Sequence, residues 1–591
     1  MAANTEAARP GSPGENVADL VTAAARRRPL AEGIVDTASG VTLTWIDVDN
    51  AATAFARRIR DAGVRPGDRV ALRLPTCAQL VIGLFAVFRS GAIAVPLSPT
   101  APDAEVCDLI TDCGARLLVA HDDLGDVPAL VPSLDHPGMP SDHASQVDGS
   151  ADGSSQEHVS SDVGSGDGGS GDVGSGDWVS EDGVSGDVGS GDWVSEDDGS
   201  RDGGSADGTS PDDSPPRDSP DDGSPVDEVG TGGEDIAAIF YTSGTSGPAR
   251  GVMLSHRALL ANVRQFAGVM PAGEHPARTL LAVPLHHIYG LGPGLLLPTA
   301  TAATIVLAQR FDARDTLHAC RTHAITTVVG VPAMYTDLAA RSAEELADAL
   351  ATVAIFMSGA APLHPRVLNA ITDATGQAVY EGYGLTEAAP VVTSTLVTGQ
   401  AKAGSVGRAL PGVELRLVDS DGSPAHAPLD PADPDDAFGD DIGLTGLVSI
   451  RGANLFSGYW PDGAHGPDAD GWYRTGDVGY LDTDGDLHLV DRANDLIIVN
   501  GFNVYPREVE DAILTLPGVA EVAVVGVLDD RTGESVRAVV RPESGAQLSE
   551  QQVIDVCEAR LARYKVPSTV EFADELPHTA VGKLRRVQLR T

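Results

Sequence analysis

The 591-residue chain is poor in cysteine, in aromatic side chains and in basic residues. It carries 40 Lys and Arg against 85 Asp and Glu, for a net charge of −45 with His neutral. This shortage of cations argues against a nucleic-acid partner, because binding to phosphate backbones requires clustered Lys and Arg. The few cysteines form no C-x-x-C pair, so neither a zinc site nor a disulfide framework is indicated. They are Cys77, Cys107, Cys113, Cys320 and Cys557.

Long hydrophobic runs are also missing. The longest clean apolar run, residues 80–88, stops at Arg89 and is far too short to span a bilayer. The stretch 291–307 is longer, but Pro293 and Pro298 interrupt it. The first residues, MAANTEAARPGSPGE, lack the apolar segment of a signal peptide. We therefore expect a cytoplasmic protein without a transmembrane segment, and peripheral contact with a membrane stays open.

The acidity is concentrated in one segment. Residues 141–235 hold 26 Asp and Glu but only two Arg, and the sequence SGDVGSGDWVSED occurs twice there, at 170–182 and 185–197. Gly, Ser and acidic residues cannot bury enough apolar surface to offset chain entropy, so we predict a disordered insertion over about residues 136–233. Calcium binding is the competing interpretation, but the spacing matches neither the EF-hand loop nor the nonapeptide β-helix repeat. An acidic interaction segment is a further alternative.

Outside the insertion, short apolar runs alternate with Ala-rich helical patterns. Residues 69–74 and 91–96 predict strands on either side of a helix over 77–88, and a helix over 104–113 precedes a strand over 115–120. This order predicts βαβ units with parallel sheets, and hence an α/β fold. Further strands are expected at 236–241, 326–330, 354–357 and 378–381.

The last third of the chain has a different pattern. From about residue 412, short alternating strands with Gly/Asp turns, such as 413–418 and 447–451, predict a small β-barrel-like subdomain. After residue 492 we expect a small α+β domain that ends in an extended stretch from residue 566. Its predicted helices are 507–516 and 550–563, and its predicted strands are 520–527 and 536–540.

The strongest chemical signal is the loop YTSGTSGPARG at residues 241–251. Glycines let several backbone N–H groups point toward one anion, and the hydroxyl groups add donors. A flexible Ser/Gly linker is the alternative, but the loop stands between two apolar segments, which favours phosphate binding. It is not the G-x-x-x-x-G-K-[ST] pattern of nucleotide hydrolases. The candidate ligands are Thr242, Ser243, Gly244, Thr245, Ser246, Gly247 and Arg250.

At this loop the sequence resembles the adenylate-forming superfamily, which includes acyl-CoA synthetases, firefly luciferase and the adenylation domains of peptide synthetases. The loop of that superfamily reads Y-T-S-G-T-[ST]-G-x-P-K-G, and Ala249 and Arg250 depart from it here. The departure at Arg250 keeps the positive charge. The resemblance covers about residues 43–586 without the insertion and is greatest to fatty acid–CoA ligases. It implies that the loop holds the β- and γ-phosphates of ATP.

Two further motifs are similar to those of the superfamily. Residues 284–290, PLHHIYG, look like its P-L-F-H-x-x-G, which implies that His287 lies beside the carboxylate substrate. Residues 358–363, SGAAPL, are similar to its adenine-site loop, where small residues let the base lie close to the backbone. The residues that this likeness assigns to the adenine site are Gly359, Ala360 and Ala361.

Residues 381–387, EGYGLTE, match another motif of the superfamily. The resemblance implies that Tyr383 stacks on adenine, beside Gly384 in the cofactor site, and that Thr386 binds the α-phosphate. It also implies that Glu387 holds Mg²⁺, a hard dication that prefers oxygen ligands.

The remaining motifs lie near the expected domain boundary and beyond it. By resemblance, Asp477 of WYRTGD binds the ribose hydroxyls, and Arg492 contacts the ribose and marks a hinge, with Asn494 at the usual pivot. The likeness thus implies a nucleotide-binding domain over residues 1–491 and a mobile lid domain over 492–591. In relatives the glycine at Gly501 lets the pantetheine arm pass, and PHTAVGKLRR places Lys583 as the adenylation lysine.

The reaction implied by this resemblance has two steps. A carboxylic acid attacks the α-phosphate of ATP to give acyl-AMP and pyrophosphate, and the thiol of CoA then displaces AMP. Charge neutralisation by Mg²⁺ and Lys583 and positioning of the reactants would carry the first step. The segment GFNVYP at 501–506 favours a medium- or long-chain fatty acid, and the small residues Gly330, Val331 and Ala333, with Gly359 and Ala360, are expected to leave room for the acyl chain.

Three alternatives remain open at this point. The chain could be an acyl-AMP ligase that loads a carrier protein in trans in place of CoA. It could be an aryl-acid or short-chain-acid CoA ligase. It could also be a binding protein without catalytic activity, which the presence of Glu387, Asp477 and Lys583 argues against.

Overall fold

The computed structural model describes residues 14–134 and 231–590, apart from gaps at 125–126, 243–248, 272–276, 420–421, 424, 426–444, 493–494, 500–501, 530 and 580–583. Nearly all of the predicted insertion lies outside the described residues. Its last residues are described, and they are hydrogen-bonded: the Asn16 side chain donates to the Thr231 carbonyl at 3.2 Å, and the Gly233 amide donates to the Glu15 carbonyl at 3.0 Å.

The larger sheet has the strand order β15-β14-β13-β12-β11-β9-β10-β1-β2. Neighbours from β1 to β13 run parallel, whereas β2, β14 and β15 are antiparallel to theirs. Its central strands are buried along their length, as expected for parallel strands that are covered on both faces. The strands are β1 (Glu32–Asp36), β2 (Thr42–Thr44), β9 (Arg278–Leu281), β10 (Thr304–Leu307), β11 (Thr327–Gly330), β12 (Ile355–Ser358), β13 (Val379–Gly384), β14 (Val391–Ser394) and β15 (Arg408–Ala409).

The order of strands in this sheet reverses at β9. The chain passes from β9 to β10 on one side and then crosses to β11 on the other side of β9. Such a reversal opens a crevice at the carboxyl ends of the strands, where open α/β sheets bind their ligands. The end of β9 leads directly into the PLHHIYG segment.

A second parallel sheet has the order β6-β5-β3-β4-β7-β8, with β8 antiparallel to β7. Because β7 and β8 flank the Ser/Gly loop, their pairing of Thr242 with Arg250 brings the two ends of that loop together. The strands are β3 (Arg69–Leu72), β4 (Ile93–Pro96), β5 (Leu117–Val119), β6 (Ala129–Leu130), β7 (Ile236–Thr242) and β8 (Arg250–Ser255). The βαβ order predicted from the sequence is confirmed.

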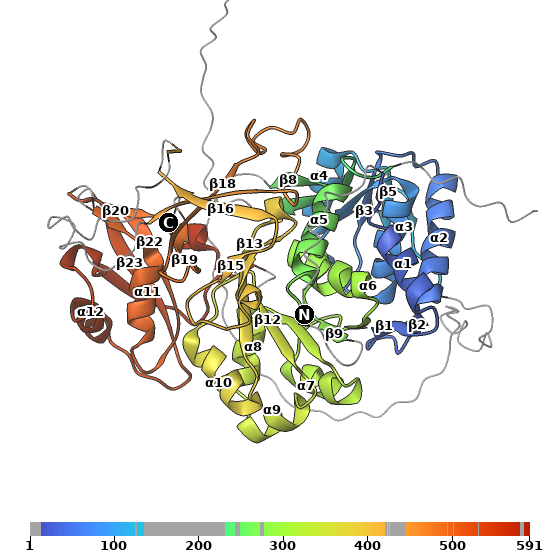
Figure 1. Cartoon of the computed structure of the whole chain (residues 1–591). Helices are drawn as coiled ribbons and strands as arrows, with labels where there is room; N and C mark the ends of the chain where they lie inside the picture. Colours follow the sequence, from blue (N-terminus) through green and yellow to red (C-terminus); the bar gives the residue numbers. More distant parts are fainter. Residues whose placement is uncertain are drawn as a thin grey trace, which may run out of the picture. The chain divides into compact units, whose positions relative to one another are not determined.

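Helices cover both sheets (Figure 1). Helix α2 starts at a capping box between Thr44 and Asp47, and α3, apolar on nearly every side, is almost wholly buried and ends at Gly91 with φ 78°. The helices of the N-terminal part are α1 (Asp19–Arg27), α2 (Trp45–Asp61), α3 (Ala78–Ser90), α4 (Asp103–Cys113), α5 (His256–Ala267), α6 (Leu297–Thr301), α7 (Ala313–Thr322), α8 (Pro332–Ala339), α9 (Ala343–Ala349) and α10 (Pro365–Thr375).

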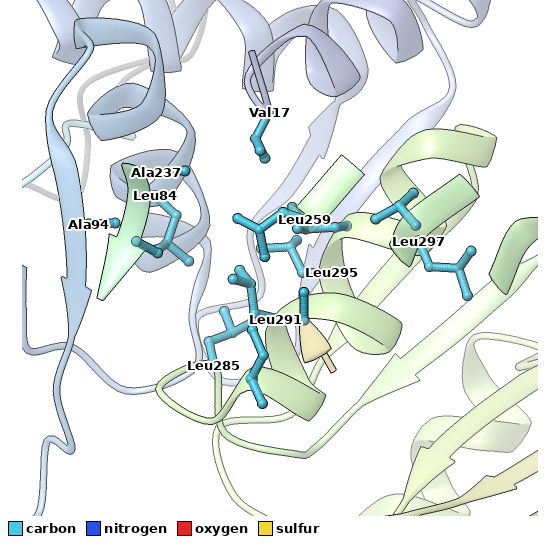
Figure 2. Packing of buried hydrophobic residues seen from close by; sticks show 14 of the residues in the cluster. Val17, Leu84, Ala94, Ala237, Leu259, Leu285, Leu291, Leu295 and Leu297 are labelled. Carbon is cyan, nitrogen blue, oxygen red and sulfur yellow. The ribbon is translucent and has the colours of Figure 1, made fainter. Parts of the chain in front are cut away.

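The main hydrophobic core lies around the π-helix η1 (Gly290–Leu296), which is buried throughout. Figure 2 shows Leu291 and Leu295 of η1 beside Leu259 of α5. The interrupted apolar stretch 291–307 therefore forms η1, α6 and β10 within the core. No helix among the described residues is both long and apolar enough to cross a membrane. All cysteines of the chain are described, and each is a free thiol.

The region after residue 412 forms an antiparallel sheet in the order β16-β17-β18-β19, as expected for the small β subdomain. Its strands are β16 (Val413–Val418), β17 (Gly446–Gly452), β18 (Tyr473–Leu481) and β19 (Leu487–Arg492). Strand β18 carries Asp477, and β19 ends at the predicted hinge residue Arg492.

The C-terminal part packs helices against a sheet ordered β21-β20-β23-β22, with β24 parallel to β23. Its strands are β20 (Ile497–Val499), β21 (Phe502–Val504), β22 (Val519–Asp529), β23 (Gly533–Pro542) and β24 (Thr569–Phe572), and its helices are α11 (Pro506–Leu514) and α12 (Glu550–Glu558). The predicted helix 550–563 is too long: α12 ends at Glu558, and the extended backbone of Ala562 leads into the short 3₁₀ helix η5 (Arg563–Lys565). The stretch from 566, expected to be extended, also contains the short helix η6 (Arg586–Leu589).

Candidate active site

The EGYGLTE motif forms the end of β13 and a tight turn after it. A Cβ atom on Gly384 would lie 2.2 Å from the carbonyl oxygen of Pro390, so only glycine fits there. The Leu385 amide donates to that same carbonyl at 3.0 Å, which closes the turn. The short helix η2 (Thr386–Ala388) then presents Thr386 and Glu387, both half-buried.

The segment that follows β17 holds this turn in place. The Phe456 amide donates to the Glu387 carbonyl at 2.9 Å, and the Asn454 side chain donates to the Ala388 carbonyl at 2.8 Å. The backbone of η2 is therefore held at Glu387 and Ala388.

Two tyrosines surround the Glu387 carboxylate. The Tyr459 hydroxyl donates to Glu387 Oε1 at 2.6 Å and lies 3.3 Å from the Tyr473 hydroxyl. Burial, followed by the charge of Glu387, raises the pKa of Tyr459 to about 12, and the same causes raise the pKa of Tyr473 further. Both hydroxyls therefore stay protonated near neutral pH and act as donors toward anions. The guanidinium of Arg250 lies 5.5 Å from the centre of the Tyr459 ring.

Tyr383 and Asp477 are brought together from distant parts of the chain. The Tyr383 hydroxyl donates to Asp477 Oδ2 at 2.6 Å, and both residues are more than nine-tenths buried. Asp477 also pairs through the backbone with Arg492 across β18 and β19. The residues predicted to contact adenine and ribose thus form one hydrogen-bonded pair beside the end of β19.

The predicted adenine loop follows β12. At Gly359 a Cβ atom would lie 2.8 Å from the Tyr289 ring, and Ala360 has a φ of 71°, in the left-handed region that non-glycine residues rarely adopt. Ala361 is half-buried, and the Leu363 amide donates to Glu381 Oε2 at 3.1 Å. Such backbone strain costs about 1–3 kcal/mol and clusters at functional sites.

Two buried polar atoms beside this loop have no hydrogen-bond partner among the residues that the structure describes. Ser358 and Glu381 face each other in register on β12 and β13, and Ser358 Oγ and Glu381 Oε1 are both unpartnered. Burial raises the pKa of Glu381 to about 7. Buried polar groups are nearly always paired, so this pair marks an exceptional place in the sheet.

His287 lies in the turn after β9 and is half-buried. Its amide donates to the Pro284 carbonyl at 3.1 Å, and its Nδ1 accepts from the Tyr289 amide at 3.2 Å. The neighbouring His286 is also half-buried, and burial lowers its pKa to about 4, so it is neutral at physiological pH.

Several predicted site residues lie outside the described residues: Ser243, Gly244, Thr245, Ser246, Gly247, Asn494, Gly501 and Lys583. Of the phosphate loop, Thr242 and Arg250 at its two ends are described, and the sheet pairs them. The roles assigned to all these residues from the sequence remain predictions.

The expectation of space beside the small residues is wrong at Gly330 and Gly359. The ring of Tyr335 lies 2.9 Å from where a Cβ of Gly330 would stand, and the Tyr289 ring occupies the same kind of place beside Gly359. Glycine at these positions admits the ring of a neighbouring tyrosine.

Sequence reasoning gave no role to Tyr459, Tyr473, Ser358 or Glu381. Ser358, Glu381 and Tyr473 lie in the motifs SGAAPL, EGYGLTE and WYRTGD, so the available signal was a polar side chain in the same motif as an assigned residue. Tyr459 lies 72 positions from Glu387, and no periodic pattern connects the two.

Comparison with known proteins identifies the class of protein. Residues 21–460 match the family described as AMP-binding enzyme, and residues 508–583 match the AMP-binding enzyme C-terminal domain. The chain therefore belongs to the AMP-binding enzyme family.

Relatives and solved structures extend this assignment. A feruloyl-CoA synthase from Amycolatopsis sp is 30% identical over 93% of this chain and 94% of its own length. A long-chain-fatty-acid–CoA ligase from Bacillus subtilis (strain 168) is 35% identical over 60% of this chain, and the match spans only 61% of that protein. The structure of ATP-bound MatB from Rhodopseudomonas palustris superimposes with a TM-score of 0.74 at 25% identity, covering 98% of both chains. This likeness confirms the predicted α/β fold with its large N-terminal and small C-terminal domains.

Proposed function

We propose that the protein is an ATP-dependent acid–thiol ligase that converts a carboxylic acid to acyl-AMP and pyrophosphate and then transfers the acyl group to CoA. The observation that carries the proposal is the pair of hydrogen-bonded clusters, Tyr383–Asp477 and Glu387–Tyr459–Tyr473, with Arg250 next to the second. They gather residues from separate motifs into the donors and acceptors that a nucleotide requires. Relatives named as CoA ligases support the same reaction.

In the first half-reaction the protein mainly binds and orients. Arg250 and the loop that starts at Thr242 would hold the β- and γ-phosphates, and Thr386 the α-phosphate. Asp477 would accept from ribose, although one of its oxygens is already engaged by Tyr383. Ordering the carboxylate and the α-phosphate in one geometry lowers the entropic part of the barrier.

The residues present fit a magnesium ion. The Glu387 side chain is half-buried, its backbone carbonyl accepts from the Phe456 amide, and its Oε1 accepts from the Tyr459 hydroxyl. A carboxylate held by such hydrogen bonds is a suitable ligand for Mg²⁺. This ion takes few protein ligands and keeps phosphate oxygens and water. When bound, the ion would neutralise phosphate charge.

In the second half-reaction, residues 492–591 would act as a domain that turns about Arg492 and Asn494. The turn would withdraw Lys583 and bring Gly501 to the pantetheine path, a hinge motion of a common kind. The boundary at residue 491 and the roles of these residues belong to the proposal.

For the acid we propose a medium- or long-chain aliphatic carboxylate. The GFNVYP segment and the fatty-acid ligase among the relatives support this choice. The feruloyl-CoA synthase, which matches nearly the whole chain, makes an aryl acid the second candidate. A carrier protein in place of CoA is the alternative acceptor.

A screen of carboxylic acids for pyrophosphate release, with and without CoA, tests the proposal. We expect release that depends on the acid, and acyl-CoA as the product when CoA is present. No acid-dependent release from folded protein would overturn the proposed reaction.

The role of Lys583 can be tested by separating the half-reactions. Lys583→Ala should reduce acyl-AMP formation by at least about a hundredfold, the scale for one transition-state charge contact, yet leave transfer from supplied acyl-AMP to CoA nearly unchanged. Arg585→Ala, which changes an exposed neighbour, serves as the control. Equal loss of both half-reactions would contradict the assigned role.

A further inference from the structure

Residues 454–460 contact two separate parts of the proposed nucleotide site. Near one end of this segment, the Phe456 amide donates to the Glu387 carbonyl at 2.9 Å. At the other end, the Trp460 amide donates to the Gly251 carbonyl at 2.7 Å. Gly251 belongs to β8, the strand that follows the Ser/Gly loop. The same short segment therefore holds both the helix η2, which carries Glu387, and the strand that leaves the phosphate loop.

The side chain of Tyr459 reaches both of these parts. Its hydroxyl donates to Glu387 Oε1 at 2.6 Å, and the guanidinium of Arg250 lies 5.5 Å from the centre of its ring. The ring packs edge to face on the buried Phe456, with 5.2 Å between the ring centres. The backbone of Tyr459 forms an antiparallel bridge to Val252 of β8. Because the ring and the backbone are both held, the hydroxyl oxygen has a defined place beside the carboxylate.

The Tyr459 hydroxyl stands in a chain of hydrogen bonds that ends at the Glu387 carboxylate. Among the described residues no other donor reaches that carboxylate. A tyrosine hydroxyl has a single hydrogen to donate, and an ionised carboxylate can only accept. The Tyr473 hydroxyl, 3.3 Å from that of Tyr459, is therefore the donor in the contact between the two tyrosines. Tyr473 thus donates to Tyr459, which donates to Glu387.

This arrangement bears on the proposed magnesium ligand. A glutamate side chain has several rotatable bonds, and a hydrogen bond to one oxygen limits the directions in which its carboxylate can point. Groups that hydrogen-bond to a metal-ligating carboxylate orient it, and their loss typically weakens metal binding roughly 10–100-fold. A phenylalanine at position 459 could pack on Phe456 in the same way, so core packing alone does not account for the hydroxyl.

We propose that Tyr459 is a positioning residue that holds the Glu387 carboxylate beside the phosphate loop and thereby strengthens the binding of ATP together with Mg²⁺. The inference rests on the proposed acid-activating function, to which the role of Glu387 as magnesium ligand belongs. Tyr459 acts through Glu387 and need not touch ATP or the ion. Its hydroxyl should therefore matter for ATP binding only when the ion is present, which separates positioning from a general contribution to folding.

The first test measures ATP binding by isothermal titration calorimetry without any acid, once with Mg²⁺ and once with EDTA. The magnesium gain is defined as the Kd in EDTA divided by the Kd in Mg²⁺. Tyr459→Phe should reduce this gain about tenfold and leave the Kd in EDTA unchanged. Tyr335→Phe is the matched control, because it removes a buried hydroxyl that donates to the Met357 carbonyl at 2.8 Å. It should lower stability and leave the magnesium gain unchanged.

A second measurement separates the half-reactions. At limiting Mg²⁺, Tyr459→Phe should slow acyl-AMP formation about tenfold, and saturating Mg²⁺ should restore most of the rate. Transfer from supplied acyl-AMP to CoA should be unchanged, because that step uses no ATP. A residue that only supports the fold would slow both half-reactions, and added Mg²⁺ would not restore them.

Two results would overturn the inference and leave the proposed function intact: an unchanged or larger magnesium gain in Tyr459→Phe, or an equal loss of ATP affinity in Mg²⁺ and in EDTA. A wild type that binds no ATP, or releases no pyrophosphate with any acid, would instead overturn the proposed function. If Tyr459→Phe does not fold, Tyr473→Phe removes the preceding donor of the chain and should reduce the magnesium gain about threefold. An unchanged gain in that variant would count against the chain of hydrogen bonds.

Discussion

Glu510 and Glu381 are two buried carboxylates in very different surroundings. Glu510 is 8% exposed and receives a forked ion pair from Arg586, at 2.7 and 2.9 Å to its two oxygens, and a backbone N–H from Val524 at 2.8 Å. Glu381 is 6% exposed and accepts one backbone N–H, and within the described part of the chain its Oε1 has no partner. Both carboxylate oxygens of Glu510 therefore have hydrogen-bond partners, whereas only one oxygen of Glu381 does.

The difference separates a structural carboxylate from a functional candidate. A buried ion is tolerated when charge pairing and hydrogen bonds offset its desolvation, as they do at Glu510. At Glu381 they do not, and its pKa rises to about 7. Perturbed groups of this kind gather at binding sites, and Glu381 holds the loop that is predicted to take adenine.

Breaking the satisfied pair should have the largest effect on stability. Arg586→Met would leave Glu510 charged and buried without its partner, and Asp495, which lies 3.7 Å from Arg586, would keep only its contact with Arg590. We expect a loss of about 3–5 kcal/mol in the stability of the C-terminal part. Hydrogen exchange of the β22 amides, including that of Val524, in the full-length protein measures it.

A double substitution and a surface pair serve as controls. Adding Glu510→Gln to Arg586→Met should recover part of the loss, because no buried charge then remains unpaired at this position. Arg541→Met breaks a half-exposed pair with Glu521 and should have a much smaller effect. A double variant less stable than the single one would contradict this account.

The unsatisfied carboxylate of Glu381 should make the unfolding free energy depend on pH. Because the pKa of Glu381 is about 7 in the folded protein against an ordinary value of 4.5, the folded state retains a proton that the unfolded state has lost. The contribution of this residue to the unfolding free energy therefore falls as pH rises from about 4.5 to about 7 and is constant above that.

Glu381→Gln should remove this dependence. At pH 8 the variant should be more stable than the wild type by up to about 3 kcal/mol, and near pH 4 the two should be nearly equal. Urea unfolding of both proteins at these two pH values measures it. A wild-type stability equal to that of the variant at both pH values would show that Glu381 is partnered in solution.

Much of the fold could be predicted because it rests on local patterns. Runs such as 69–74 and 236–241 are apolar and end in turns, and parallel pairing then follows from the alternation with helices. The tight turn after β13 likewise lies within a single motif, EGYGLTE, in which Gly384 has no room for a side chain. Thus the residues of single motifs could be placed from their own segments.

The contacts that could not be predicted join residues from segments far apart in the sequence. Glu387 and Tyr459 meet across 72 positions, and Tyr383 and Asp477 across 94, without any periodic signal. The error at Gly330 and Gly359 has a related cause. A glycine in a sequence means that something comes close, and only the tertiary structure shows that this is a tyrosine ring and not a substrate.

The smallest effect concerns Ser358, which lies opposite Glu381 in register. Its buried hydroxyl has no hydrogen-bond partner among the described residues, so Ser358→Ala removes a desolvation cost that no hydrogen bond offsets and should stabilise the protein by about 1 kcal/mol. Ser255 is the matched control, because it is equally buried but its hydroxyl accepts the Ala258 amide at 3.2 Å as the cap of α5. Ser255→Ala should destabilise by about 1 kcal/mol. Opposite signs in urea unfolding would support the contrast between satisfied and unsatisfied groups, whereas a loss in both variants would mean that Ser358 has a partner in solution, such as an internal water.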